Sequence, residues 1–339
     1  MPLSIFHACV VFCLSVALAT GTASADTQGK PEPPGQPASG PGSNDYPFEH
    51  TRITAYGEGA GGYYIIEPRE APEQALPVVL FVHGMGATSY GGYHAWVTHL
   101  VRKGNVVLFP LYHDKGIVDP ATFTNTAAAA AAEAIKRCDG DTHALIDTDR
   151  LTMVGHSLGG TIIANLAARP RHFKLPAPKA IMPLQSGDTR ADSGLGALLS
   201  SITEDHSTIA KGTLMLIVDV EKDRVVSPKV GQRIHDNADR VAVRNKRRLV
   251  LRNDDHGEPT IIADHMLPNG WFDRQKRHVS VNTYDFALWR WFDSLQALAH
   301  GDEEHRDHVF GEVALNLGHW SDGTPVRRPI DASAGKLEP

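Results

Sequence analysis

One serine of the chain lies in a context that favours nucleophilic chemistry. Ser157 stands at the centre of Gly155-His156-Ser157-Leu158-Gly159, which follows the apolar run Leu151–Val154 and precedes the helix-like stretch Thr161–Ala168. A tight turn from strand to helix forces such a serine into a strained backbone conformation, and a side chain at either glycine would collide with the neighbouring strand or helix. The Leu158 amide, at the helix start, can then face a developing oxyanion. We predict that Ser157 is a nucleophile; the alternative is a glycine-rich turn with a spectator serine.

A second glycine-containing loop follows an earlier apolar run. His83-Gly84-Met85-Gly86 ends the run Val78–Val82. A loop of this kind can bring a backbone amide toward a nucleophile that follows a neighbouring strand. The sequence therefore predicts part of an oxyanion-binding site here, unless the glycines only make a tight turn.

Two aspartates compete for the place of a catalytic acid. Asp219 abuts the apolar run Leu214–Val218, whereas Asp223 lies in Glu221-Lys222-Asp223-Arg224-Val225-Val226. In either position the alternative is a solvated loop carboxylate.

Two histidines compete for the place of the base. His256 lies in Asp254-Asp255-His256-Gly257, just beyond the run Leu249–Leu251, where a loop can carry an imidazole back over the nucleophile. His265 is the rival, but the segment Pro259–Ala263 moves it further from the strand end. We therefore predict His256 as the base and expect His265 at the surface or in packing.

Together, the Gly155–Gly159 turn, His83-Gly84 and the later Asp and His resemble the α/β-hydrolase superfamily, especially its bacterial esterase and lipase branches, over residues Pro77–His256. The resemblance implies the chain order Ser, acid, His. It implies that Met85, after His-Gly, is an oxyanion donor beside Leu158, and that His83 holds the loop. It favours Asp223, because a valine shortly after the aspartate is typical of the acid loop. A serine where dienelactone-hydrolase-like members carry cysteine favours ester substrates.

The predicted activity is carboxylic-ester hydrolysis by Ser157, Asp223 and His256, without cofactor or metal. His256 would take the serine proton and return it to the leaving alcohol, while Asp223 would hold the imidazole tautomer. No His-Glu-x-x-His pair occurs, and His305 with His308 would supply too few metal ligands. The expected substrate is a small ester, a lipid or a polyester. Alternatives are an amidase, a thioesterase or an acyltransferase using the same triad, or a catalytically silent binding protein on this fold, which would not need all three residues.

Alternating apolar runs and helix-like segments predict the elements that position these residues. Six short runs are typical of strands buried on both faces of a parallel sheet: Val78–Val82, Val106–Phe109, Leu151–Val154, Ala180–Leu184, Leu214–Val218 and Leu249–Leu251. The alanine-rich segment Thr122–Arg137 and the apolar-periodic segment Tyr284–Ala299 predict helices. Thr51–Ile66 predicts two antiparallel edge strands with a turn at Gly57–Gly62. The expected fold is a three-layer α/β/α sandwich with a mostly parallel central sheet.

Features that could set the substrate are less specific. The stretch Leu184–Lys211 is too short for a separate cap domain. Tyr90, Tyr93 and Trp96, and Trp271-Phe272 further on, are candidates for an acyl pocket, although each of them is more often a core residue. The tail with Trp320-Ser321-Asp322-Gly323 either extends the domain or covers a sheet edge.

The first residues predict export. The apolar run Val10–Ala19 and the following Ala23-Ser24-Ala25 are typical of a signal peptide, although no Lys or Arg precedes the run. The run is shorter than the about 20 residues that span a bilayer, so an uncleaved anchor is the lesser alternative. We therefore divide the chain into a signal peptide (1–25), a flexible linker rich in Pro, Gly and Ser (26–45) and a catalytic domain (46–339). The protein would then be secreted or periplasmic.

Charge and cysteine content exclude some classes of protein. Cys9 and Cys13 lie in the predicted signal peptide, which leaves Cys138 without a partner for an internal disulfide. The net charge of −6 and a single short basic cluster, Arg244–Arg248, make nucleic acid an unexpected partner. We interpret the cluster as a solvated strand end. Oligomeric state leaves no signal in the sequence.

Overall fold

The computed structural model describes residues 29–70, 72–114, 119–140, 142–187, 204–269 and 283–334. It divides the chain into two units, Met1–Lys30 and Pro31–Pro339, and the fold described below belongs to the second. The predicted signal peptide (1–25) and the pair Trp271-Phe272 lie outside the described residues.

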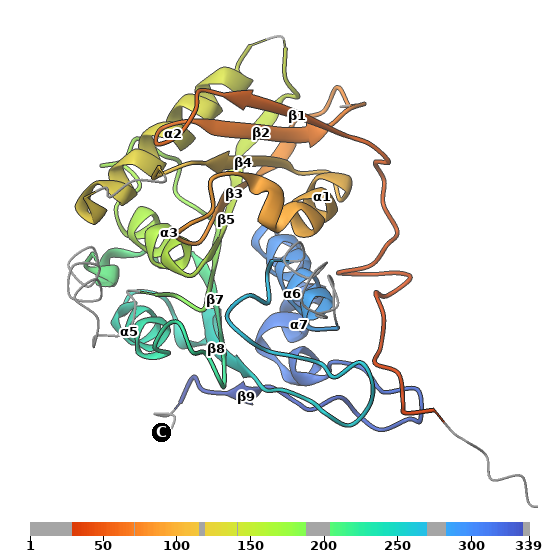
Figure 1. Cartoon of the computed structure of the whole chain (residues 1–339). Helices are drawn as coiled ribbons and strands as arrows, with labels where there is room; N and C mark the ends of the chain where they lie inside the picture. Colours follow the sequence, from red (N-terminus) through yellow and green to blue (C-terminus); the bar gives the residue numbers. More distant parts are fainter. Residues whose placement is uncertain are drawn as a thin grey trace, which may run out of the picture. The chain divides into compact units, whose positions relative to one another are not determined.

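A nine-stranded, mostly parallel sheet forms the centre of the protein, with the strand order β1-β2-β4-β3-β5-β6-β7-β8-β9 (Figure 1). Strands β3 to β8 pair in parallel, whereas β1–β2, β2–β4 and β8–β9 are antiparallel pairs. The six predicted apolar runs are all strands, and the predicted edge hairpin with its turn at residues 57–62 is also confirmed. The strands are β1 (Thr51–Tyr56), β2 (Tyr63–Pro68), β3 (Leu76–Val82), β4 (Val106–Pro110), β5 (Ile146–His156), β6 (Ala180–Leu184), β7 (Leu214–Val220), β8 (Lys246–Leu251) and β9 (Ile330–Asp331).

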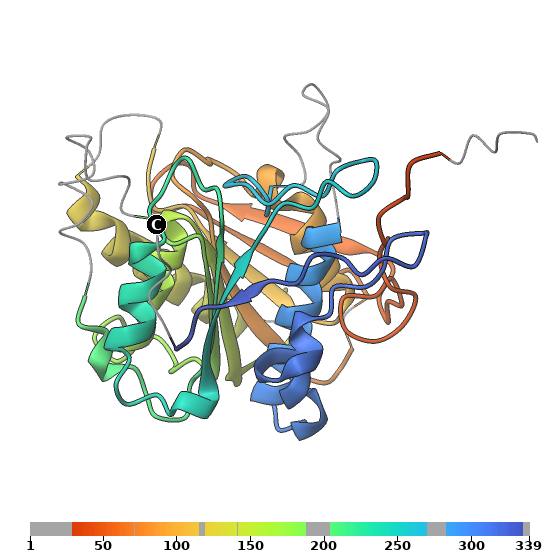
Figure 2. The ribbon, with the colours of Figure 1, turned by 90° about the horizontal axis from the view of Figure 1, so that it is seen from below.

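Helices cover both faces of the sheet, as Figure 2 shows. One face packs against α2 (Phe123–Cys138), α3 (Leu158–Ala168) and α5 (Lys229–Asn237), and the other against α1 (His94–Arg102), α6 (Thr283–Ala299) and α7 (Arg306–Phe310). Each face has its own apolar core cluster. The predicted α/β class with three layers is therefore confirmed, as are the two helices predicted over residues 122–137 and 284–299.

Parallel pairing brings the functional loops to one edge of the sheet. Strands β3, β5, β6, β7 and β8 run in the same direction, so their carboxyl ends meet at a single edge. The loop at residues 83–86 follows β3, Ser157 follows β5, Asp223 follows β7, and residues 252–269 follow β8. This edge is where the candidate site forms.

The segment predicted as a flexible linker is bound to the domain from Pro31 onward, so this prediction is wrong for residues 31–45. The Gly42 amide donates to the Asp293 carboxylate (2.8 Å), and Lys103 donates to the Ser43 hydroxyl (2.9 Å). The Glu258 amide donates to the Pro31 carbonyl (2.9 Å). Proline and glycine limit helix and strand formation here, but they do not prevent the backbone from making hydrogen bonds with the domain.

The tail covers a sheet edge, one of the two alternatives that the sequence leaves open. Strand β9 pairs with β8 at the end of the sheet. Upstream of β9, the buried Trp320 donates from its indole nitrogen to the Asp254 carboxylate (3.0 Å).

The interpretation of Arg244–Arg248 as a solvated strand end is wrong for its last two residues. Arg247 and Arg248 lie buried in β8 and pair with Asp331 (2.8 Å) and Asp219 (2.7 Å). Buried arginines need such partners because an unpaired charge is costly away from water.

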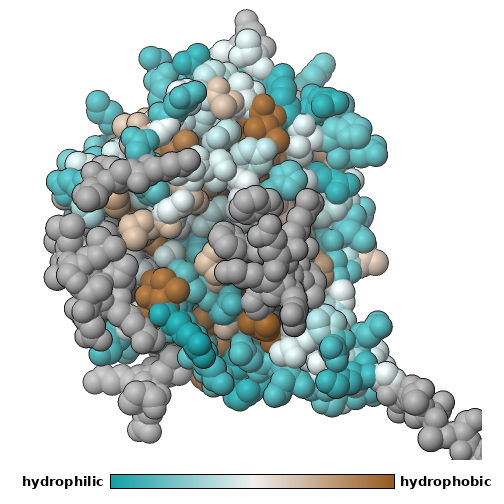
Figure 3. Space-filling model, viewed as in Figure 1, coloured by the Kyte–Doolittle hydropathy of each residue, from teal (hydrophilic) through white to brown (hydrophobic). Residues whose placement is uncertain are grey.

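Hydrophobic residues on the face shown in Figure 3 form small, separate patches on a largely hydrophilic surface. Among the described helices, none is long and apolar enough to cross a membrane. Cys138 is a buried free thiol, and burial raises its pKa to about 12.

Candidate active site

The turn after β5 has the strained geometry that the sequence predicts. Ser157 adopts φ 54° and ψ −123°, in the left-handed half of the backbone map where non-glycine residues are rare. A Cβ atom at Gly155 would lie 2.3 Å from the Gly159 carbonyl oxygen, and one at Gly159 would lie 2.1 Å from the Val82 carbonyl oxygen. Only glycine fits at these two positions, which explains the spacing of the motif.

Backbone hydrogen bonds hold the serine in this conformation. The Ser157 amide donates to the Leu184 carbonyl at the end of β6 (2.9 Å), and the Ser157 carbonyl accepts from Gly160 (2.9 Å) and Gly187 (3.2 Å). Strand β6, the loop that follows it and the first turn of α3 thus hold the serine in the strained conformation.

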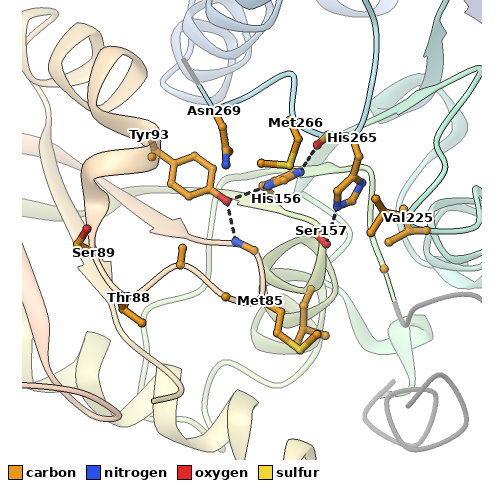
Figure 4. A pocket seen from close by; sticks show the side chains of 17 residues that line it. Met85, Thr88, Ser89, Tyr93, His156, Ser157, Val225, His265, Met266 and Asn269 are labelled. Carbon is orange, nitrogen blue, oxygen red and sulfur yellow. Dashed lines mark hydrogen bonds between the residues drawn. The ribbon is translucent and has the colours of Figure 1, made fainter. Parts of the chain in front are cut away.

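A histidine and an aspartate complete a chain of hydrogen bonds with Ser157. Figure 4 shows the contact between His265 and Ser157. His265 Nε2 lies 3.1 Å from Ser157 Oγ, and His265 Nδ1 lies 2.7 Å from Asp223 Oδ2. The other carboxylate oxygen of Asp223 accepts from the amides of Val225 (2.8 Å) and Val226 (2.9 Å). All three members are largely buried, with 7 to 9% of Ser157, Asp223 and His265 exposed. With Asp223 accepting at Nδ1, Nε2 is free to take the serine proton.

The predicted position of His256 over the nucleophile is wrong. His256 Nε2 lies 2.7 Å from Asp322 in the tail, and its ring packs against Trp320. Its side chain is 36% exposed. Of the three residues predicted as a triad, the structure brings Ser157 and Asp223 together and puts His265 where His256 was expected.

The path of the loop after β8 explains why His265, and not His256, lies beside Ser157. Asp254 and Ile261 form an antiparallel bridge with two backbone hydrogen bonds (3.0 and 2.9 Å), and the Ala263 amide donates to the Asn253 side chain (2.8 Å). Residues 255–260, which include His256, therefore form a turn that leaves the sheet and returns to it. The intervening residues do not move His265 away from the strand end. Gly257 and Pro259 inside this stretch are turn residues, and they are the sequence signal that could have indicated it.

Asp219, the alternative acid, has a structural role. Its carboxylate pairs with Arg248 on the neighbouring strand β8 and is 3% exposed. Burial raises the pKa of Asp219, while Arg248 opposes that shift. The choice of Asp223 over Asp219 agrees with the geometry.

No family model matches this chain, and no curated protein matches it. The chemistry of the site therefore follows from its own atoms, which are a hydroxyl, an imidazole and a carboxylate joined by two hydrogen bonds. Such a chain can activate the hydroxyl as a nucleophile and return a proton to a leaving group.

Both predicted oxyanion donors border the cavity in front of the serine. Met85 and Leu158 line it, and neither amide donates a hydrogen bond within the part of the chain that the structure describes. The amides on either side of Met85 are already engaged, because Gly84 donates to the Tyr93 hydroxyl (2.8 Å) and Gly86 to His113 (3.0 Å). The two unengaged amides are the ones expected to stabilise an oxyanion.

His83 is held inside the protein, which agrees with the structural role expected for it. Its Nδ1 lies 2.8 Å from the Gly84 carbonyl, and its ring stacks on Tyr112. Burial lowers its pKa to about 3, so it is neutral at ordinary pH. Among the described residues, no three or more His, Cys, Asp or Glu side chains cluster so that they could hold a metal ion.

The cavity at Ser157 has a volume of about 530 Å³, within the range of small-molecule sites. Its described walls are mainly apolar and include Met85, Leu158, Val225, Val226 and Met266, with no Lys, Arg, Asp or Glu among them. Of the aromatic candidates for this pocket, Tyr93 is part of the lining, whereas Trp96 is buried in the core. Tyr90 is not among the described lining residues.

Proposed function

We propose that the protein is a serine hydrolase that cleaves carboxylic esters through an acyl-enzyme on Ser157. The observation that carries the proposal is the position of His265, with one ring nitrogen 3.1 Å from Ser157 Oγ and the other 2.7 Å from Asp223. A buried Ser-His-Asp chain opening into a cavity is the arrangement that acyl transfer requires.

In the proposed reaction, His265 takes the Ser157 proton as the hydroxyl oxygen attacks the ester carbonyl. The amides of Met85 and Leu158 donate to the oxyanion of the tetrahedral intermediate. His265 then gives the proton to the departing alkoxide, which leaves as the alcohol. Water, deprotonated by the same imidazole, then attacks the acyl-enzyme carbonyl. His265 returns that proton to the departing Ser157 oxygen, and the carboxylic acid is released. Asp223 holds the imidazole tautomer and stabilises its positive charge in both halves of the reaction.

We further propose that the fold is that of an α/β-hydrolase. In support, the nucleophile follows β5, the acid follows β7 and the base follows β8. The chain order Ser, Asp, His is the one expected of that family, and the first unengaged amide after His83-Gly84 is that of Met85. The replacement of His256 by His265 leaves this order unchanged.

The cavity favours an uncharged ester with an apolar group. Its described walls hold no fixed charge that could pair with an ionised substrate, and burying an unpaired charge is costly. Met85 and Val225 are 44% and 48% exposed and border the same cavity, so an apolar chain can contact them near the entrance. A small ester, a lipid or a polyester segment fits this description. We place the reaction outside the cytoplasm because of the leader-like residues Val10–Ala25.

Hydrolysis of p-nitrophenyl esters from acetate to palmitate, by the wild type and Ser157→Ala, tests the proposal. We expect the variant to lose about 10⁴-fold or more of kcat/KM, since removal of a triad member leaves only binding and oxyanion stabilisation. Circular dichroism verifies that both proteins are folded. Equal inactivity of two folded proteins on every ester would contradict the proposal, and amide, thioester and acyl-acceptor substrates would then be tested before a catalytically silent binding protein.

A further inference from the structure

Two buried side chains join three of the four loops that make up the candidate site, those after β3, β5 and β8. The Tyr93 hydroxyl lies 2.8 Å from the Gly84 amide and 2.8 Å from His156 Nδ1. His156 Nε2 lies 2.8 Å from the carbonyl oxygen of His265. Figure 4 shows these contacts as a continuous line from the loop after β3, through Tyr93 and His156, to the loop that carries the base.

The direction of each hydrogen bond is determined from both ends. The His265 carbonyl only accepts, so His156 Nε2 carries a proton. The Gly84 amide only donates, so the Tyr93 oxygen accepts from it and its own hydrogen points to His156 Nδ1. This pattern needs a neutral imidazole and a protonated phenol. Burial provides both, because it lowers the pKa of His156 far below its usual value and raises that of Tyr93.

Each end of the line lies next to an atom that the proposed reaction uses. Gly84 directly precedes Met85, whose amide is a proposed oxyanion donor. The carbonyl at the other end belongs to His265 itself. The preceding carbonyl, of Asp264, accepts from the Gln185 side chain at the end of β6 (2.6 Å), so the base loop is fixed at two successive peptide groups.

The packing leaves little freedom in this line. A Cβ atom at Gly84 would lie 3.1 Å from His156 Nδ1, 3.2 Å from the Tyr93 hydroxyl and 3.3 Å from Ser157 Cβ. Tyr93 and His156 are 1% and 2% exposed. A displacement of either ring would therefore move the glycine loop or the base loop relative to the nucleophile.

We propose, resting on the function proposed above, that Tyr93 and His156 are positioning residues that hold the Met85 amide and the His265 imidazole in register with Ser157. Neither side chain forms a hydrogen bond with the Ser157 hydroxyl or with the His265 ring, so neither transfers a proton in the proposed reaction. Tyr93 sets the distance between the oxyanion loop and the serine turn, and His156 sets that between the turn and the base. The second residue of the Gly-His-Ser-Leu-Gly motif thus has a task of its own in this protein.

The first test is Tyr93→Phe, which keeps the ring but removes the hydroxyl that joins Gly84 to His156. We expect kcat to fall about 10 to 100-fold with KM within about threefold of the wild type, because misplacement of catalytic groups by a fraction of an ångström weakens the transition state more than substrate binding. Both constants are measured with the best p-nitrophenyl ester, and kcat is calculated from the concentration of folded protein. The labelling rate of Ser157 by a fluorophosphonate, which needs no ester, should fall in parallel.

A matched control is Tyr56→Phe. Tyr56 also bonds a histidine, with its hydroxyl 2.7 Å from His143 Nε2, but this pair contacts Glu67 on β2 and not the candidate site. We expect Tyr56→Phe to leave kcat and the labelling rate within about twofold, since losing a hydrogen bond remote from the candidate site affects stability alone.

The second test compares His156→Leu with His156→Gln. Leucine removes the donor to the His265 carbonyl, whereas the glutamine amide nitrogen can occupy the place of Nε2 and donate there. We expect about a 100-fold loss of kcat in His156→Leu, of which His156→Gln recovers about tenfold. A merely structural role would lower the melting temperature of both variants without this difference in kcat per folded enzyme.

The outcomes separate the inference from the proposed function. If the wild type hydrolyses esters, Ser157→Ala does not, and Tyr93→Phe keeps the wild-type kcat and labelling rate, the positioning role is overturned while the esterase stands. Equal kcat in His156→Leu and His156→Gln would also overturn it for His156. If the folded wild type neither hydrolyses esters nor reacts with the fluorophosphonate, the proposed function fails and the positioning role fails with it.

Discussion

Two histidines on the loop after β8 each pair with an aspartate at the same distance, yet only one of these pairs contacts the serine. His265–Asp223 and His256–Asp322 are both 2.7 Å apart. The first pair has side chains 9% and 4% exposed and contacts Ser157, whereas the second is 36% and 40% exposed and contacts the tail. In the exposed pair water competes for each hydrogen bond and screens the charge, while the buried pair keeps its orientation and its electrostatic strength. A short contact between His and Asp therefore does not identify a catalytic base.

The two pairs have different roles: one joins the turn to the C-terminal tail, and the other contacts the serine. Asp254, at the start of the turn, accepts from the His256 amide (3.1 Å), from the Trp320 indole (3.0 Å) and from the Arg327 amide (2.8 Å). His256 thus stands where the turn and the C-terminal tail are joined. His265 stands beyond the bridge, where the chain has come back to the carboxyl ends of the strands.

Removing each histidine in turn is the most direct test of this difference between the two pairs. We expect His265→Ala to lose about 10⁴ to 10⁶-fold of kcat/KM, since the serine loses its base, and His256→Ala to stay within about threefold. Steady-state hydrolysis of the best p-nitrophenyl ester measures both. The reverse ranking would show that the loop rearranges and that His256 is the base.

Substitution of the two aspartates should give the same difference in activity, but with a smaller loss of kcat than the histidine variants. Asp223→Asn keeps the shape of the side chain but no longer selects the imidazole tautomer, so kcat should fall about 10³ to 10⁴-fold. The matched change Asp322→Asn should leave kcat within about twofold, because its partner has no catalytic task. The kcat of each variant at saturating ester measures the effect, and similar losses in the two would contradict the distinction between the pairs.

Acid should destabilise the protein through the histidines buried around the site. His83 and His156 are neutral in the folded protein because burial lowers their pKa, that of His83 to about 3. In the unfolded chain both take up a proton near pH 6.5, so the unfolded state binds more protons below that pH and stability is lost as the pH falls. We expect His83 to account for a loss of about 2 kcal/mol of unfolding free energy between pH 7 and pH 5, and His156 to add a loss in the same direction.

Urea unfolding of the wild type, His83→Asn and the control His256→Ala at the two pH values measures this. The loss between pH 7 and 5 should be smaller in His83→Asn and unchanged in His256→Ala. The difference between the two pH values is compared, so a general loss of stability in His83→Asn does not obscure the result. An equal loss in all three proteins would mean that His83 is protonated in the folded state.

Much of the fold could be predicted from local pattern. The apolar runs identify β3 to β8, because strands covered on both faces must be apolar throughout. The spacing Gly-x-Ser-x-Gly predicts the strained turn, because only glycine fits against Val82 and against the helix start. The base was missed because its position depends on the pairing of Asp254 with Ile261, which distance along the sequence does not reveal. The burial of Arg247 and Arg248 depends in the same way on carboxylates of distant elements.

By itself, the sequence determined the strands, the sharp turn at Ser157 and the placement of Asp223 after β7, since these depend on neighbours along the chain and on the space around a Cβ atom. Only the tertiary structure decided which histidine meets the serine, that the segment from Pro31 is bound to the domain, and that Tyr93 and His156 join the loops of the site. The physical reason is that these outcomes rest on hydrogen bonds between residues far apart in the chain. Such bonds form only when the parallel sheet has brought the carboxyl ends of its strands to one edge.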